Sequence, residues 1–345
     1  MRIIKKYTVS LTEALKQNIL CWSQQFEEVV WLDSNKEHNL QNKSNYKAIL
    51  AVDAFTAIKT DYHQAFDQLE EYQSKTKDWL FGYLTYDLKN DVERLKSNNF
   101  DGLHFPDLYF FQPKKVFLFR DHEVEIQYLH FVDDELAFDW EEITNYNVNH
   151  NVLESTSTAK IHLRTSKDSY FNKLYKILEH IHSGDIYEVN FCQEFYSENT
   201  EIDAVKTFIH LNEISKAPFA TYLKLGDLYS LSASPERYIS KNGTTIISQP
   251  IKGTAKRHSD PKEDKKLKVE LENDPKERSE NIMIVDLVRN DLSRFAKKGT
   301  VKVAELCNVY SFAQVHQLVS TITCQVDLNR SPVSIIKETF PMGSM

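Results

Sequence analysis

Short apolar runs rich in aromatic and β-branched residues recur along the first 138 positions and alternate with polar segments. This pattern is typical of β-strands, and we predict strands at residues 29–32, 48–52, 79–86 and 115–119. Between them, Ala65, Leu69 and Tyr72 recur at helical spacing and predict a helix over residues 61–72. The first part of the chain therefore contains mostly strands.

Residues 139–160 are rich in Asn, Ser and Thr and lack clear periodicity, so we interpret them as a linker or surface excursion. After them, Phe171, Leu174 and Leu178 share one face of a predicted helix over residues 168–182, with Ser166 as N-cap and Gly184 as its stop. Further helices are predicted at 279–295, after a lysine- and glutamate-rich stretch at 260–277, and from the Ser-Pro pair at 331–332 to residue 339. Between the helix at 168–182 and the last helix, we predict strands at 186–195, 220–224, 228–232, 244–248, 301–303 and 320–326.

Many strands with only occasional long helices favour an α+β fold with large, mostly antiparallel sheets. We divide the chain into an N-terminal region, residues 1–150, and a second region, residues 160–345.

The overall composition is that of a globular protein, with 345 residues, 41% hydrophobic and 27% charged. The net charge of −8 makes nucleic acid an unfavourable partner. The four cysteines form no C-x-x-C pair and favour a reducing compartment over a disulfide framework or a zinc site. We expect no membrane span, because no run approaches about 20 apolar residues. The first residues lack a signal-peptide core, so we expect a cytoplasmic protein.

Two loops after predicted strands carry candidate chemistry. Glu236 follows a Ser-Pro turn and is either a surface carboxylate or a buried acid/base whose pKa an apolar cleft raises. Lys252 precedes Gly253 and Thr254 and is either a solvated lysine or a nucleophile. An ordinary lysine, with a pKa near 10.4, is neutral in only about one molecule in 2,500 at pH 7. A nucleophilic lysine therefore needs desolvation or nearby positive charge.

Two further polar residues interrupt apolar elements. Glu280, at the predicted start of the 279–295 helix, is either an N-terminal charge that favours the helix dipole or a Mg²⁺ ligand. Asn281 and Asp291 at the two ends could simply be caps. His316 enters an apolar strand as either a satisfied core histidine or a hydrogen-bond donor lining a substrate cleft.

The order of these segments is more specific than any one of them. S-P-E-R at 234–237, P-I-K-G-T at 250–254, S-E-N-I-M-I-V-D-L-V-R-N-D at 279–291 and V-H-Q-L-V-S-T-I at 315–322 resemble the chorismate-utilising family. That family includes the large subunits of anthranilate and aminodeoxychorismate synthases, isochorismate synthases and salicylate synthases. The resemblance is strong from about residue 165 onward and weaker before it. It implies two large, mostly antiparallel sheets packed face to face with helices outside, as in anthranilate synthase component I.

Lysine at position 252, where anthranilate and isochorismate synthases carry alanine, resembles the aminodeoxychorismate synthase branch. The resemblance implies that Lys252 attacks C2 of chorismate, that Glu236 is the acid/base and that Glu280 holds Mg²⁺. It also implies substrate contacts from His316, Gly253 and Thr254. The product would be 4-amino-4-deoxychorismate, a p-aminobenzoate and folate precursor, with ammonia supplied by a glutamine amidotransferase subunit.

The segment F-P-M-G-S at 340–344 also resembles a motif of this family. Family members continue past it with a second metal-binding glutamate and the groups that hold the substrate carboxylates. We therefore expect the C-terminal part of the fold to be missing and this chain alone to be inactive. Two alternatives stay open: an anthranilate or isochorismate synthase in which Lys252 is incidental, and an inactive fragment with a binding role. The segment Trp31-Leu32-Asp33-Ser34 leaves open a tryptophan or inhibitor pocket in the N-terminal region.

Overall fold

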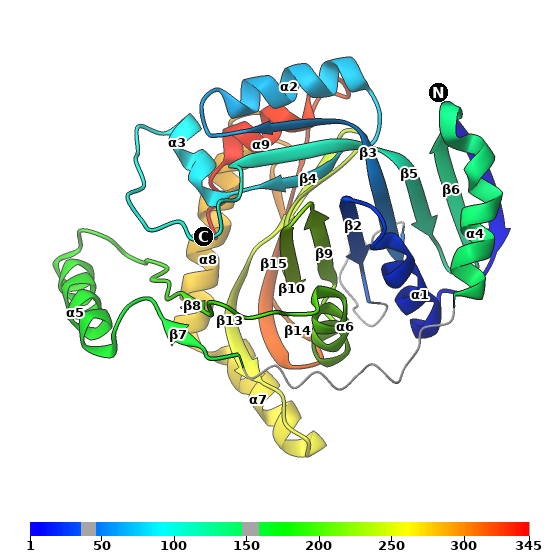
Figure 1. The fold of residues 1–345 in the computed structure, drawn as a ribbon. Coiled ribbons are helices and arrows are strands. Elements are labelled where there is room, and N and C mark those ends of the chain that lie inside the picture. The colour runs from blue at the N-terminus through cyan, green and yellow to red at the C-terminus, as the bar shows by residue number, and fades with distance from the viewer. Residues whose placement is uncertain (36–45, 147–158, 345) are drawn as a thin grey trace. The chain divides into compact units, whose positions relative to one another are not determined.

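A computed structural model of the chain describes residues 1–35, 46–146 and 159–344. Two compact units are distinguished, one formed by residues 1–148 and 208–344 and the other by residues 149–207 (Figure 1). The division into regions 1–150 and 160–345 remains a prediction.

The first unit contains an antiparallel sheet in the order β1-β6-β5-β3-β2-β9-β10, with β4 paired to β5. Its strands are β1 (Arg2–Thr8), β2 (Glu28–Asp33), β3 (Ala48–Thr60), β4 (Phe81–Leu84), β5 (Leu108–Phe119), β6 (Glu123–Leu129), β9 (Phe219–Leu225) and β10 (Leu228–Ser234). Strands from residues 2–129 and from residues 219–234 share this sheet, because β9 pairs with β2.

A second antiparallel sheet of the same unit has the order β11-β12-β15-β13, with β14 also paired to β15. Its strands are β11 (Arg237–Asn242), β12 (Thr245–Gln249), β13 (Ile251–Lys256), β14 (Lys302–Ser311) and β15 (Val315–Gln325). Phe219 of β9 packs with Phe312 and with Val319 of β15, so apolar side chains of the two sheets meet in one cluster. The predicted α+β class with large antiparallel sheets is confirmed.

The helical elements of this unit pack against the sheets or against one another. They are α1 (Glu13–Ser23), α2 (Ala65–Thr76), η1 (Tyr86–Leu88), α3 (Lys89–Val92), η2 (His130–Glu135), α4 (Leu136–Asn145), α7 (Pro261–Asn273), α8 (Pro275–Ser293) and α9 (Pro332–Thr339). Helix α8 lies beside β13 and β15 of the second sheet (Figure 1). Its residues Ile284, Val288 and Leu292 recur at helical spacing and pack on Ile246 and Ile322 of that sheet. This apolar stripe holds the helix that carries Glu280 against the strands that carry Lys252 and His316.

The second unit contains α5 (Lys167–Ser183) and a two-stranded pair, β7 (His162–Leu163) with β8 (Phe195–Tyr196). The predicted caps of α5 are confirmed, since the Ser166 side chain accepts a hydrogen bond from the backbone of Ser169 and Gly184 ends the helix with φ +79°. The helix α6 (Ala204–Ser215) begins in this unit and ends in the first.

The predicted strand at 186–195 is wrong, because only its last residue lies in β8 and Tyr187 is 82% exposed. A run of apolar residues indicates that a segment can form a β-strand, but the strand forms only where a neighbouring strand is available to hydrogen-bond with it. Among the described residues of this unit, only His162–Leu163 supplies such an edge.

Four other segments differ from what the sequence indicates. Residues 139–145 of the predicted linker belong to α4, in which Leu136, Trp140 and Ile143 are buried at helical spacing; residues 147–158 lie outside the described residues. The lysine- and glutamate-rich stretch forms α7, capped by Asp260. The next helix begins at Pro275 with Asp274 as its cap, so Asn281 lies inside α8 and does not cap it. The helix predicted at 61–72 runs instead from Ala65 to Thr76.

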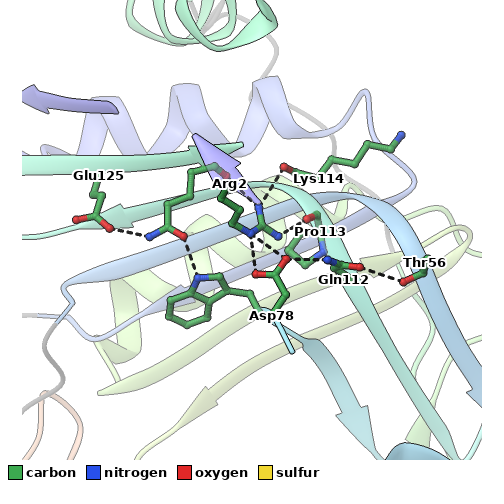
Figure 2. Close-up of polar contacts among 9 residues, drawn as sticks. Arg2, Thr56, Asp78, Gln112, Pro113, Lys114 and Glu125 are labelled. Carbon is green, nitrogen blue, oxygen red and sulfur yellow. Dashed lines mark hydrogen bonds and ion pairs between the residues drawn. The ribbon is translucent and has the colours of Figure 1, made fainter. Parts of the chain in front are cut away.

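A buried arginine fixes the N-terminal strand to the first sheet (Figure 2). Arg2 Nε donates to both carboxylate oxygens of Asp78 at 2.8 and 3.0 Å, and its terminal nitrogens donate to the backbone oxygens of Pro113 and Gln127, among others. Burial alone would raise the pKa of Asp78, but hydrogen bonds from Arg2 and Gln112 outweigh it and lower that pKa. The guanidinium is therefore buried with its charge paired.

Candidate active site

The backbone at Lys252 departs from regular strand geometry. Ile251 pairs with Val319 and Thr254 with Gln317, so two residues of β13, Lys252 and Gly253, stand opposite one residue of β15. Such a bulge adds a residue to one strand and changes the direction of its side chains. The half-buried Lys252 therefore lies on a β-bulge and not on an ordinary loop.

Gly253 makes this bulge possible. Its φ of +92° lies in the region that favours glycine, and a Cβ atom built there would come within 2.9 Å of Leu318 Cδ1 and 3.1 Å of Glu277 Oε2. A carboxylate of α8 therefore lies directly against the bulge. Backbone geometry explains why a glycine stands at position 253. The predicted contact between Gly253 and substrate stays a prediction.

Glu236 lies where the chain passes from one sheet to the other, between β10 and β11. The turn is held by the backbone N–H of Glu236, which donates to Ser234 Oγ at 3.2 Å. Ser344 and the backbone of Ile251 hydrogen-bond to the Glu236 carboxylate, while its Oε1 is buried with no hydrogen-bond partner in the described part of the chain. Burial raises the pKa of Glu236, opposed by these hydrogen bonds and by the positive charge of Lys252.

This environment matches the interpretation of Glu236 as a buried carboxyl with a raised pKa, and not as a surface carboxylate. A desolvated carboxyl with a raised pKa is a better proton donor near neutral pH than a surface glutamate. The cavity beside it, also lined by Asp291 and Gly343, has a volume of ≈ 20 Å³. That is room for about one water molecule.

Glu280 lies in the second turn of α8 and not at its start, so the predicted benefit from the helix N-terminus is wrong. Its side chain is 33% exposed and lies 3.2 Å from Lys276 Nζ, which also lies 3.5 Å from Glu277. The two glutamates raise the pKa of Lys276. Sequence reasoning missed Glu277, although its spacing of three residues from Glu280 places the two carboxylates on neighbouring turns.

Within residues 1–35, 46–146 and 159–344, no group of three or more His, Cys, Asp or Glu residues is placed to hold a metal ion. Glu277 and Glu280 nevertheless lie on neighbouring turns of α8, with Glu277 against the bulge at Gly253. The ammonium group of Lys276 lies within ion-pair distance of both carboxylates.

His316 is 1% exposed on β15, and both of its ring nitrogens have protein partners. Nδ1 lies 2.8 Å from Ser311 Oγ, and Nε2 lies 3.1 Å from Asp264 Oδ1 of α7. Arg257 and the backbone of His258 lower the pKa of Asp264 well below its usual range, so that carboxylate is ionised and accepts from the ring. A contact between His316 and substrate stays a prediction, and it would require one of these bonds to break. Thr254 is exposed, and its hydroxyl accepts from Gln317 Nε2 at 3.4 Å.

A separate cavity of ≈ 310 Å³ lies in the first unit, lined in part by Lys16, Trp31, Asp33, Phe208 and Asn212. Lys16 Nζ lies 2.7 Å from Asp33 Oδ2. A cavity therefore lies at the segment 31–34, for which the sequence did not decide whether a tryptophan or inhibitor pocket is present. The binding of such a ligand stays a prediction.

The chain matches the family of chorismate binding enzymes over residues 9–345 and belongs to that family. It is 42% identical over 190 residues to aminodeoxychorismate synthase component 1 of Escherichia coli, a match that covers 55% of this chain and 42% of that protein. It is 33% identical over 273 residues to anthranilate synthase component 1 of Thermus thermophilus, covering 76% of this chain and 58% of that protein. The chain therefore spans about half the length of these relatives.

Among solved structures, anthranilate synthase component I from Streptococcus pneumoniae superposes with a TM-score of 0.74 at 21% identity, over 88% of this chain and 76% of that one. This likeness supports the fold predicted from the resemblance. Along the described part of the chain, no helix is long and apolar enough to cross a membrane.

Proposed function

We propose that this protein converts chorismate and ammonia to 4-amino-4-deoxychorismate, with Lys252 as a covalent nucleophile. The observation that carries the proposal is the juxtaposition of Lys252 on the β13 bulge with the buried carboxyl of Glu236, whose pKa the Lys252 charge affects. A nucleophile and a proton donor must reach the same substrate for covalent displacement. Similarity to a protein named aminodeoxychorismate synthase component 1 supports the choice of reaction.

In the first step, the neutral amine of Lys252 forms a C–N bond at C2 of the ring. Both ring double bonds shift by one position, the C4–O bond breaks, and Glu236 protonates the departing hydroxyl so that it leaves as water. Hydroxide is a poor leaving group without such a proton. In the second step, ammonia adds at C4, both double bonds shift back, and the C2–N bond to Lys252 breaks, which releases the neutral amine. Glu236 recovers its proton from the ammonium nitrogen formed at C4, and the enolpyruvyl group is retained.

Glu277 and Glu280 are the residues that would hold Mg²⁺, since this ion is often bound by one or two carboxylates together with substrate oxygens and water. When bound, the ion would neutralise and orient the substrate's C1 carboxylate. Binding requires Lys276 to leave the two carboxylates, which its 74% exposed side chain permits.

Ammonia is supplied, in this proposal, by a glutamine amidotransferase subunit. The Escherichia coli relative is named as a first component, which implies a second one for that protein. We further propose a cytoplasmic location, because none of the four cysteines, all of which are among the described residues, is in a disulfide, and reduced thiols are the rule in that compartment.

Similarity to the Thermus thermophilus protein, named anthranilate synthase component 1, supports an alternative in which ammonia attacks C2 directly and Lys252 is incidental. The two functions differ in their products. The alternative releases pyruvate and forms fluorescent anthranilate, whereas the proposed reaction does neither.

The test is Lys252→Ala in the protein expressed from its complete gene, assayed with chorismate, ammonium and Mg²⁺. We expect formation of 4-amino-4-deoxychorismate to fall on the order of 10³-fold, because the covalent step is lost. Lys256→Ala is the matched control, since Lys256 is an exposed lysine on the same strand. Retention of para-amination by Lys252→Ala, or anthranilate and pyruvate as the wild-type products, would refute the proposal.

A further inference from the structure

Asn281 lies on α8 at the back of the bulge and is 1% exposed. Its Nδ2 donates to the backbone oxygen of Lys252 at 3.3 Å and to that of Leu318 at 3.1 Å. These two carbonyl groups belong to the two strands that the bulge pushes out of register. One side-chain amide therefore joins β13 and β15 where their pairing is interrupted.

The other end of the same amide is fixed as well. Asn281 Oδ1 accepts from Ser320 Oγ at 2.5 Å and lies 3.5 Å from the thiol of Cys307. Ser320 Oγ in turn accepts from the backbone N–H of Cys307 at 2.9 Å, and Cys307 has a left-handed φ of +53°. An asparagine amide has two donor hydrogens and two acceptor lone pairs, and here all four are used. The amide cannot rotate without breaking bonds on both sides.

We propose that Asn281 is the positioning residue of Lys252, holding the peptide plane after Lys252 so that its side chain leaves the bulge in one direction. This inference rests on the proposed role of Lys252. The carbonyl held by Asn281 and the positive φ of Gly253 together determine the backbone on the C-terminal side of Lys252. Asn281 acts through the main chain, because its amide bonds the Lys252 carbonyl rather than the ammonium group.

A purely structural role for Asn281, joining α8 to the second sheet, predicts lost stability and no local change at Lys252. The two roles are separated by the relative reactivity of Lys252 and Lys256 toward acetic anhydride, measured by mass spectrometry of the labelled protein. Lys256 lies on the same strand and is exposed, so it corrects for reagent and handling.

In Asn281→Ala, the Lys252 side chain is no longer held in one direction, so we expect the reagent to reach it more often and the Lys252:Lys256 labelling ratio to rise. A rise of about fivefold corresponds to losing a hydrogen bond of about 1 kcal/mol. Ser320→Ala is the matched control, because it removes a partner of the same amide on the side away from Lys252. There the ratio should stay within about twofold of the wild-type value, while both variants lose stability by a similar amount.

An unchanged ratio in folded Asn281→Ala, or an equal rise in Ser320→Ala, would overturn the positioning role. Asn281→Leu, which keeps the side-chain volume, replaces Asn281→Ala if the latter does not fold, with the same two outcomes. Failure of the proposed function gives a different result: Lys252→Ala would retain para-amination, whatever the labelling ratio.

Discussion

Gly253→Ala is expected to lower the free energy of unfolding of the first unit for two reasons, an unfavourable backbone conformation and a steric clash of the new methyl group. A residue with a Cβ at positive φ costs roughly 1–2 kcal/mol, and the φ at Gly253 is +92°. The new methyl group would also lie 2.9 Å from Leu318 Cδ1 and 3.1 Å from Glu277 Oε2. Overpacking of this kind costs about 1–3 kcal/mol. We therefore expect a loss of about 2–5 kcal/mol in the free energy of unfolding.

The matched control is Gly243→Ala. Gly243 has a φ of +58°, and no heavy atom lies within 4 Å of a Cβ built on it. This variant should lose only the backbone part, roughly 1–2 kcal/mol. The difference between the two variants therefore measures how closely α8 and β15 approach the bulge.

Urea unfolding followed by tryptophan fluorescence is the suitable assay, because all four tryptophans lie between residues 22 and 140 of the first unit. A lower midpoint with an unchanged slope reports lost stability. If Gly253→Ala lost no more stability than Gly243→Ala, Glu277 and Leu318 would not contact the bulge. The described site geometry would then be wrong.

Two further predictions concern buried charges. Burial raises the pKa of Glu236, so the wild-type protein loses stability as pH rises from the ordinary glutamate pKa, about 4.3, through the raised value. Glu236→Gln should therefore gain stability relative to wild type over that range, and parallel urea-midpoint curves against pH would contradict this. Asp78→Ala should cost about 3–5 kcal/mol, because it leaves the Arg2 charge buried and unpaired, with the Arg2 side chain only 8% exposed. Adding Arg2→Met should restore part of the loss, and a double variant no more stable than Asp78→Ala would exclude this cause.

The elements that were predicted correctly carry their signals locally. The predicted helix after Ser331 is confirmed because Ser331 caps α9 and Pro332 is its first residue. The helix α4 escaped prediction because acidic residues separate its three buried apolar side chains and a polar segment follows it. The polar composition of residues 139–160 therefore led to a linker prediction, although the apolar residues Leu136, Trp140 and Ile143 recur at helical spacing.

The candidate site likewise depends on contacts between distant residues, which local sequence patterns do not predict. Its motifs could be found in the sequence one by one, whereas the bulge depends on the register between β13 and β15, which no local pattern fixes. Glu277 became visible only through its contact with Gly253, because an acidic residue in the first turn of a helix is ordinary. Conversely, His316 stood out as an isolated histidine in an apolar strand, and the structure binds both of its nitrogens within the protein.

These placements follow from one feature of the topology. The chain leaves the first sheet at Ser234 and enters the second at Arg237, so Glu236 stands at the passage between the sheets. A hairpin at Gly243 returns the chain as β12, which continues past Pro250 as β13 along the same partner strand, β15. There the backbone of Ile251 bonds the Glu236 carboxylate and Lys252 follows directly. The proposed acid/base is thus hydrogen-bonded to the residue that precedes the proposed nucleophile on β13. Their relative position depends on the β11-β12-β15-β13 sheet as a whole and on the α8 residues that hold its bulge.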